Sequence, residues 1–275
     1  MKHNDPILEI IEKSGNGFHL KVSDHLKSLG WDVDISQYYS DPVTGKPREI
    51  DIIAKKNFPI SDSGENILIS FFIECKYVNS ENVIWFIDKD LEKTKKLISS
   101  NRVMRDCEDY QLKIINGTSI KMHHYIDGNK VAKLTAKNGN TDIFFDGMNG
   151  CLHGLISLEN QNYETYRLNY PLIVLNSFDK IHEVIDSGDT PYSTVRENFQ
   201  LAVDYSYLEK DKQVKRHFIV DVVSLDLLTE FLEKIEEIDI EILKNLAISE
   251  IRENRYQEAI YRRNEDDGYG MYSAV

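Results

Sequence analysis

Charged residues inside two apolar runs constrain this chain more than any other feature. The first run surrounds Asp51, and the second, residues 67–73, leads directly into Glu74-Cys75-Lys76. Isoleucine, leucine and phenylalanine dominate both runs, which is typical of strands. A charge seldom lies within a buried strand without a partner or a task, because removing an ion from water is costly. These charges need a shared explanation, and a bound divalent metal ion is the simplest one.

Side-chain alternation along strands predicts how these groups lie. Glu74 and Lys76 share one face of their strand, and Cys75 points to the opposite, apolar face. Antiparallel pairing of the two strands brings Asp51 beside Glu74. The two carboxylates and the main-chain carbonyl of Cys75 then form a site of oxygen donors, for which Mg²⁺ or Mn²⁺ is the natural ion.

Such a site has the groups that phosphodiester hydrolysis needs. The metal ion lowers the pKa of bound water and neutralises charge on a phosphate. Lys76 can orient or help to deprotonate the attacking water and can stabilise the transition state. The alternative is a satisfied salt-bridge cluster of Asp51, Glu74 and Lys76 on a half-exposed sheet face, with no chemistry.

Hydrophobic periodicity and turn residues predict the remaining elements. Helices are expected over 18–29, 88–106, 143–158, 225–236 and 241–263, and strands over 31–39, 48–54, 67–77, 172–175 and 217–223. A polar loop is expected over 55–66. In the second of these strands, Ile50 and Ile52 should face the core, and Glu49 should share the face of Asp51.

This order predicts one mixed α/β domain over residues 1–275, with a sheet built from both ends of the chain. The motif-bearing core is 15–77, and the elements within 88–263 complete and cover the sheet. Residues 83–87 fit either a short extension or a loop packed on the core. The last residues, 264–275, are expected to form a frayed tail.

The charge distribution bears on nucleic-acid binding. The net charge of −13 argues against a nucleic-acid partner. However, the first 140 residues are neutral overall, so the acidic second half can face away from a bound backbone. Four basic residues are candidates for phosphate contacts, with solvated surface charges as the alternative: Lys46, Arg48, Lys93 and Lys96.

Cysteine content and hydropathy predict a cytoplasmic protein without membrane contact. The three cysteines, Cys75, Cys107 and Cys151, are sparse and odd in number, which favours a reducing compartment. No apolar run reaches the roughly 18 residues that a membrane span requires. The N-terminus has no apolar segment of the secretory type. Cys75 is expected to be an inert core residue.

Asp51, the tripeptide 74–76 and the preceding helix with its Gly17-Phe18 start together resemble the PD-(D/E)xK restriction-endonuclease-like superfamily. Mrr-like and Holliday-junction-resolvase-like nucleases are the most similar members, and the resemblance is best over 15–77. It implies an α/β fold with a restriction-endonuclease-like core. That core comprises a helix, a three-stranded meander, a helix and further strands in a mixed central sheet, here followed by C-terminal helices.

The resemblance also implies roles for individual residues. Asp51 and Glu74 correspond to the metal ligands for Mg²⁺ or Mn²⁺, and Lys76 corresponds to the catalytic lysine. Ile50 stands where the superfamily has its proline. Relatives often place a further metal-site glutamate early in the first helix, where this chain has His19 and Lys21. The acidic residues that are candidates for this auxiliary role are Glu9, Glu12, Asp24 and Glu49.

The leading functional hypothesis is a metal-dependent DNA endonuclease of a defence or repair system. Related nucleases often act as homodimers, so a second copy is an expected partner. The chain has no phosphate-binding Gly-x-x-x-x-Gly-Lys-Ser/Thr loop, so any ATP dependence would come from a partner ATPase or helicase. Two alternatives stay open: a catalytically inactive nucleic-acid-binding or scaffold subunit, and RNA cleavage by the same site.

Overall fold

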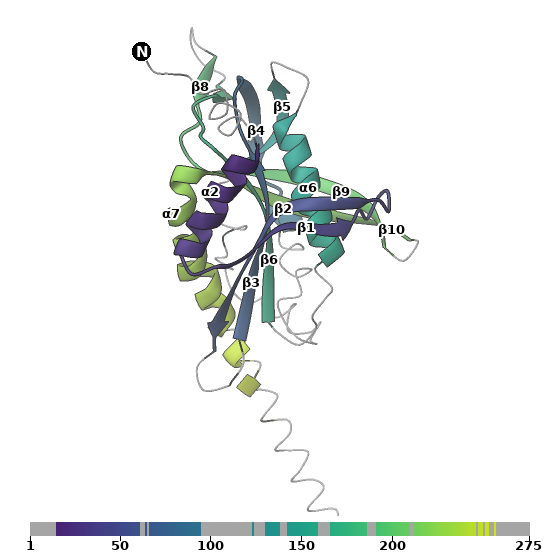
Figure 1. The fold of residues 1–275 in the computed structure, drawn as a ribbon, viewed down its shortest axis with the longest axis vertical. Helices are drawn as coiled ribbons and strands as arrows, with labels where there is room; N and C mark the ends of the chain where they lie inside the picture. The colour runs from purple at the N-terminus through teal and green to yellow at the C-terminus, as the bar shows by residue number, and fades with distance from the viewer. Residues whose placement is uncertain are drawn as a thin grey trace, which may run out of the picture.

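The computed structural model of the protein describes residues 15–60, 64, 66–94, 123, 130–137, 142–158, 166–185, 191–209, 212–245, 247–249, 251–252 and 256. Within this part, the chain forms a mixed α/β fold with one large mixed sheet and few helices (Figure 1). This confirms the predicted α/β class.

The sheet has ten strands within the described residues, in the spatial order β1-β2-β3-β6-β10-β9-β5-β4-β7-β8. Their bounds are β1 Asp32–Ser40, β2 Pro47–Pro59, β3 Asn66–Lys76, β4 Asn82–Asp88, β5 Lys130–Lys137, β6 Tyr166–Leu175, β7 Ile181–Val184, β8 Tyr192–Thr194, β9 Phe199–Glu209 and β10 Lys212–Ser224. The helical elements are α2 Gly15–Ser28, α6 Ile143–Leu158, the 3₁₀ turn η1 Leu225–Leu227, α7 Leu228–Ile235 and the π-helical turn η2 Glu236–Ile240.

Strand order explains how distant segments meet in the sheet. Strands β1, β2 and β3 form an antiparallel meander. Strand β6 adds to β3 in parallel, and β10 adds in parallel to β6. The centre of the sheet therefore combines early and late segments of the chain, as the sequence predicted.

Helices cover both faces of this sheet, and the sheet separates two apolar cores. Figure 1 shows α2 and α7 on one side and α6 on the other. Helices α2 and α7 bury one set of side chains against the sheet: Phe18, Val22, Leu26, Phe231 and Leu232. Helix α6 buries another set: Phe144, Cys151, Leu152 and Leu155. At the centre of the first core, Phe71 contacts the rings of Trp31 and Tyr170 at centroid distances of 5.0 and 5.2 Å.

The predicted boundaries hold best where periodicity is strong. Helix α6 spans the predicted 143–158, and α2 begins three residues before the predicted start. The predicted loop over 55–66 is wrong in its first part, because β2 stays paired with β3 as far as Pro59. The polar residues of this segment are what suggested a loop. Lys56 lies within the strand, and its side chain pairs with Glu236 at 2.6 Å.

The middle of the chain differs more from the predictions. Residues 82–88 form the strand β4, so the helix predicted to begin at residue 88 is wrong there, and the helical residues described after it are 91–94. The predicted C-terminal helices 225–236 and 241–263 have no break between them, since η1, α7 and η2 lead into helical residues 241–245. The predicted tail, 264–275, lies outside the described residues.

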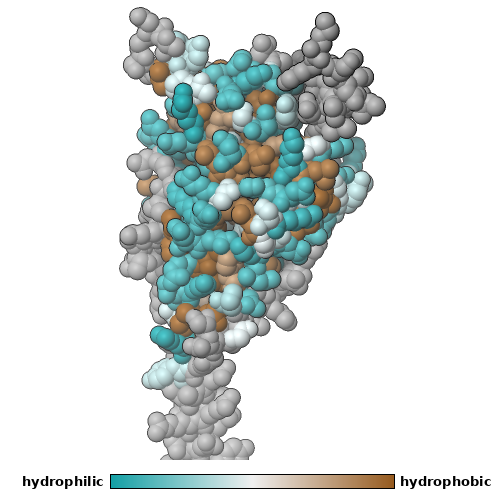
Figure 2. Space-filling model, turned by 60° about the vertical axis from the view of Figure 1, so that its left-hand side comes forward, coloured by the Kyte–Doolittle hydropathy of each residue, from teal (hydrophilic) through white to brown (hydrophobic). Residues whose placement is uncertain are grey.

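Large apolar side chains also reach the surface. Figure 2 shows them as separate hydrophobic patches among hydrophilic residues on one face. Among the exposed ones are Leu20 on α2 and Tyr77 just after β3. No helix of the described residues has the length and apolar character needed to span a membrane.

Candidate active site

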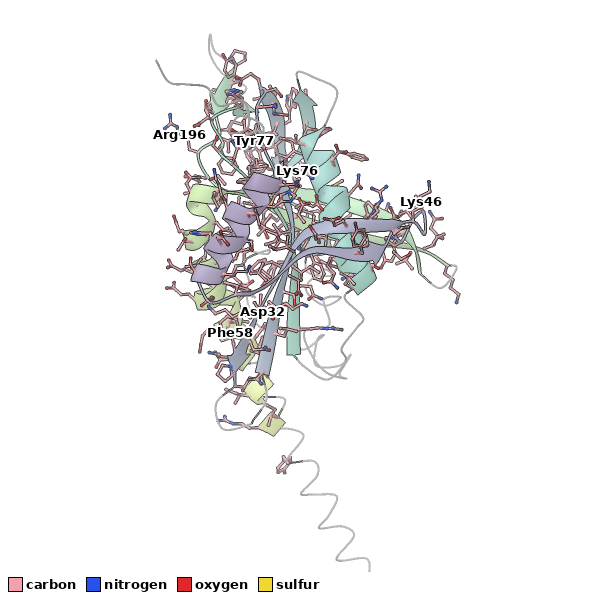
Figure 3. All side chains as sticks on the ribbon, in the orientation of Figure 1. Asp32, Lys46, Phe58, Lys76, Tyr77 and Arg196 are labelled. Atoms are coloured by element: carbon pink, nitrogen blue, oxygen red, sulfur yellow. The ribbon has the colours of Figure 1, made fainter. Side chains whose placement is uncertain are left out.

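Strand β2 leaves strand β3 next to Asp51. The paired residues of β2 and β3 end at Ile52 and Ile73, whereas β2 remains paired with β1 as far as Pro47. The hairpin formed by β1 and β2 therefore continues without β3 and carries Lys46 far from Lys76 (Figure 3). Such a fork leaves backbone groups of β3 without ladder partners on that side.

The β1–β2 pairing is irregular at the same level. Ser36 lies across from Asp51, but the regular pairing includes only the residues on either side of them. The φ of Ser36 is 57°, in the left-handed region that residues other than glycine rarely adopt. Ile50 and Ile52 are both buried, as predicted, but they belong to different cores: Ile50 to the α6 side and Ile52 to the α2 side. Strand β2 therefore changes face at Asp51, which simple alternation did not predict.

The Asp51 carboxylate fills the gap at the fork. Its Oδ2 atom accepts a hydrogen bond from the Cys75 main-chain N–H at 2.8 Å. The same oxygen lies 3.1 Å from Nε2 of His19 on α2. This hydrogen bond raises the pKa of His19, against the opposing effect of burial. The Cys75 backbone group that contacts Asp51 is the amide, and the role of its carbonyl as a metal ligand stays a prediction.

Glu74 and Lys76 share the opposite face of β3, as predicted. Lys76 Nζ donates to Glu74 Oε2 at 2.7 Å. Burial raises the pKa of Glu74 to about 7, the charge of Asp51 adds to that shift, and Lys76 opposes it. Burial lowers the pKa of Lys76, but Glu74 and Asp51 outweigh it, so the net shift is upward. Cys75, which lies between them in the sequence, points to the other face of β3 and is buried in the α2-side core.

Exposure differs among these groups in a way that matters for binding. The side chain of Glu74 is 7% exposed, whereas those of Asp51, His19 and Lys76 are 17%, 18% and 23% exposed. Asp51, His19 and Lys76 thus form the side of the site that solvent reaches. Figure 3 shows Lys76 and Tyr77 near the start of α2, and the rings of Tyr77 and Phe18 are 6.4 Å apart.

Helix α6 closes the site from the other face. A Cβ atom at Gly150 would lie 2.3 Å from Cδ of Glu74, so only glycine lets the helix approach that carboxylate. The Tyr39 hydroxyl donates to the Gly150 carbonyl at 3.5 Å. Burial raises the pKa of Tyr39 well above its ordinary value. Gly150 and Tyr39 were not predicted as site residues; the spacing of glycines along 143–158 was the available signal.

The two predicted auxiliary ligands that the structure describes form no hydrogen bond or ion pair with the site. Asp24 and Glu49 are exposed, and within the described residues no hydrogen bond or ion pair joins either of them to Asp51 or Glu74. Glu9 and Glu12 lie outside the described residues. The residue that reaches Asp51 from the first helix is His19.

Three of the basic residues predicted for phosphate contact lie in the described part of the chain, in other settings. Arg48 forms an ion pair with Asp41 in the β1–β2 hairpin, and Lys46 is exposed at its tip. Lys93 pairs with Asp204 at 2.9 Å. Lys96 lies outside the described residues. The described cations of this set therefore give no support to a phosphate track beside Asp51.

The arrangement provides two ways to hold a divalent ion. Asp51 and Glu74 supply carboxylate oxygens, which suit Mg²⁺ or Mn²⁺. A second donor set, from His19, Asp51 and Cys75, has its three ligand atoms within 4.8 Å of one another.

Comparison of the chain with protein-family models, with curated proteins and with solved structures finds no match. The interpretation of the site therefore depends on its own geometry.

Replacing Gly150 by alanine should destabilise the protein, because the new methyl group must displace the buried Glu74 carboxylate. We expect a loss of about 1–3 kcal/mol in the free energy of unfolding, measured by urea denaturation. Gly147→Ala in the same helix is the matched control. Its Cβ would meet Ile173 Cδ1 at 3.1 Å, at the end of a side chain that can shift. Equal losses in the two variants would contradict the close contact at Glu74.

The raised pKa of Glu74 should make stability depend on pH. Between its ordinary value of 4.5 and about 7, the folded protein binds this proton and the unfolded chain does not. The contribution of Glu74 to stability must therefore fall as the pH rises through that window. Relative to Glu74→Gln, the wild type should lose about 3 kcal/mol between pH 4.5 and pH 8, measured by urea denaturation. Parallel pH profiles for the two proteins would contradict the burial of an ionisable Glu74.

Proposed function

We propose that the protein is a metal-dependent nuclease that hydrolyses DNA phosphodiester bonds with Asp51, Glu74 and Lys76. The observation that supports this most is the meeting of the three groups at the fork between β2 and β3. Asp51 accepts the N–H of Cys75, so it lies beside the strand that carries Glu74 and Lys76. Two carboxylates and a lysine at one point of a sheet suit hydrolysis of a phosphate ester.

The order of elements supports the same proposal. Helix α2 is followed by the antiparallel meander β1–β3, and after an insertion α6 leads into β6, which lies parallel to β3. Without that insertion, the order is helix, three strands, helix, strand. This is the order expected for a restriction-endonuclease-like core, and we propose that fold for the chain.

Each residue has a distinct task in this proposal. A Mg²⁺ or Mn²⁺ ion held by Asp51 and Glu74 supplies positive charge for the phosphate and makes bound water more acidic. The Cys75 N–H and His19 hold the Asp51 carboxylate in place from two directions. Lys76, kept charged by Glu74, provides a cation that can orient water and stabilise charge that develops on the phosphate.

A second function follows from one specific contact. The Lys76 ammonium pairs with Glu74 at 2.7 Å, and the Glu74 side chain is almost fully buried. A closed ion pair of this kind also fits a catalytically inactive nuclease fold, in which the two charges serve only the structure. Such a protein would act as a nucleic-acid-binding or scaffold subunit beside an active partner.

Cleavage assays separate these functions. Purified protein incubated with supercoiled DNA, linear DNA or RNA should cut DNA with Mg²⁺ or Mn²⁺ and should not cut it with a chelator. Asp51→Asn, Glu74→Gln and Lys76→Ala should each lower the rate at least about 100-fold, because each removes a group that acts on the reacting phosphate.

The matched control is Lys55→Ala, which removes an exposed lysine of β2 that pairs with Asp34 at 3.0 Å. This variant should cut DNA at the wild-type rate. Absence of metal-dependent cleavage in the folded wild type would favour the inactive fold, and cleavage of RNA alone would overturn the choice of substrate. Thermal unfolding of each variant verifies that lost activity does not reflect lost structure.

A further inference from the structure

Three different ligand atoms meet at Asp51 in a way that the proposed nuclease chemistry does not use. They are His19 Nε2 or Nδ1 from α2, a carboxylate oxygen of Asp51 from β2, and Cys75 Sγ from β3, all within 4.8 Å of one another. His19 Nε2 and Asp51 Oδ2 are 3.1 Å apart. The backbone of Cys75 is fixed to the same carboxylate through its N–H. The three donors are thus anchored on three elements that pack together.

These separations fit the ligands of one small ion. Zinc-type ions bind nitrogen and oxygen at about 2.0–2.2 Å and sulfur at about 2.3 Å, so two donors on one tetrahedral ion lie roughly 3.3–3.7 Å apart. The His19–Asp51 separation is already close to that range. The other separations are at most 4.8 Å, and the His19 side chain is 18% exposed, so its ring has solvent on one side into which it can turn.

The chemistry of the donors selects the kind of ion. Mg²⁺ prefers oxygen ligands only, whereas imidazole and thiolate favour borderline transition ions. We propose that His19, Asp51 and Cys75 form a binding site for a zinc-type divalent ion. Three protein ligands leave the fourth tetrahedral position open to water or substrate, which is the pattern of catalytic rather than structural zinc sites.

The burial of the donors suits such a site. Cys75 belongs to the α2 core and is 5% exposed, so the sulfur is shielded from bulk oxidants, while Asp51 and His19 face solvent on the other side. An ion can therefore enter past His19 and meet the sulfur last. The thiol proton leaves to solvent when the sulfur binds the ion. The site shares Asp51 with the proposed catalytic set, but it does not depend on cleavage activity.

Cobalt spectroscopy tests this site, because Co²⁺ replaces zinc and reports its ligands. Titration of the reduced full-length protein with Co²⁺ should give one tightly bound equivalent, with visible bands of a tetrahedral ion and a near-ultraviolet band from the thiolate. Zn²⁺ should displace the cobalt, and excess Mg²⁺ should not. Cys75→Ser should abolish the thiolate band, and His19→Ala should weaken binding at least about 10-fold.

Cys151→Ser is the matched control, since it removes another buried cysteine, on the α6 side of the sheet. It should keep the thiolate band. X-ray absorption at the zinc edge of the loaded wild type, which needs no variant, should show one sulfur ligand. A thiolate band that survives Cys75→Ser, zinc bound without sulfur, or displacement by Mg²⁺ would overturn the proposal.

The two proposals fail separately. Sulfur-ligated cobalt in a protein that cuts no nucleic acid with any ion would support the zinc-type site and contradict the proposed nuclease function. DNA cleavage with Mg²⁺ in a protein that binds no cobalt through sulfur would support the nuclease function and contradict the zinc-type site.

Discussion

The hydrogen bond from the Cys75 N–H to the Asp51 carboxylate is the contact on which the site depends. Where β2 parts from β3, this amide loses the carbonyl that a continuing ladder would offer, and Asp51 Oδ2 takes its place at 2.8 Å. A buried N–H without a partner costs about 1–3 kcal/mol, so the fold itself holds the carboxylate at the fork. His19, Glu74 and Lys76 then surround a charge that is already fixed.

Glu74 shows what this arrangement costs in stability. The carboxylate is almost buried against Gly150, and burial raises its pKa to about 7. A core position would normally hold an apolar side chain, and a charge there weakens the folded state near neutral pH. The apolar cores on both faces of the sheet supply the stability that allows it. Residues that break local rules in this way are expected at functional sites.

Sequence patterns predicted this site in part, and the limits have physical causes. Alternation along β3 placed Glu74 and Lys76 on one face and Cys75 on the other, because that period is a local property. The face change at Asp51 comes from the departure of β2 from β3 and from the left-handed Ser36, and neither has a local signal. Lys89 falls within the predicted helix 88–106, yet it is buried and donates to Gln200, a partner 111 positions along the chain.

Anomalous diffraction from crystals grown with Mn²⁺ tests the proposed metal site, since it locates the ion without any assay of activity. We expect an anomalous peak at coordination distance from a carboxylate oxygen of Asp51, with Glu74 turned from Lys76 toward the ion. A structure with no peak at Asp51, in which the Glu74–Lys76 and His19–Asp51 pairs persist, would contradict it and leave a structural salt-bridge cluster in place of a metal site.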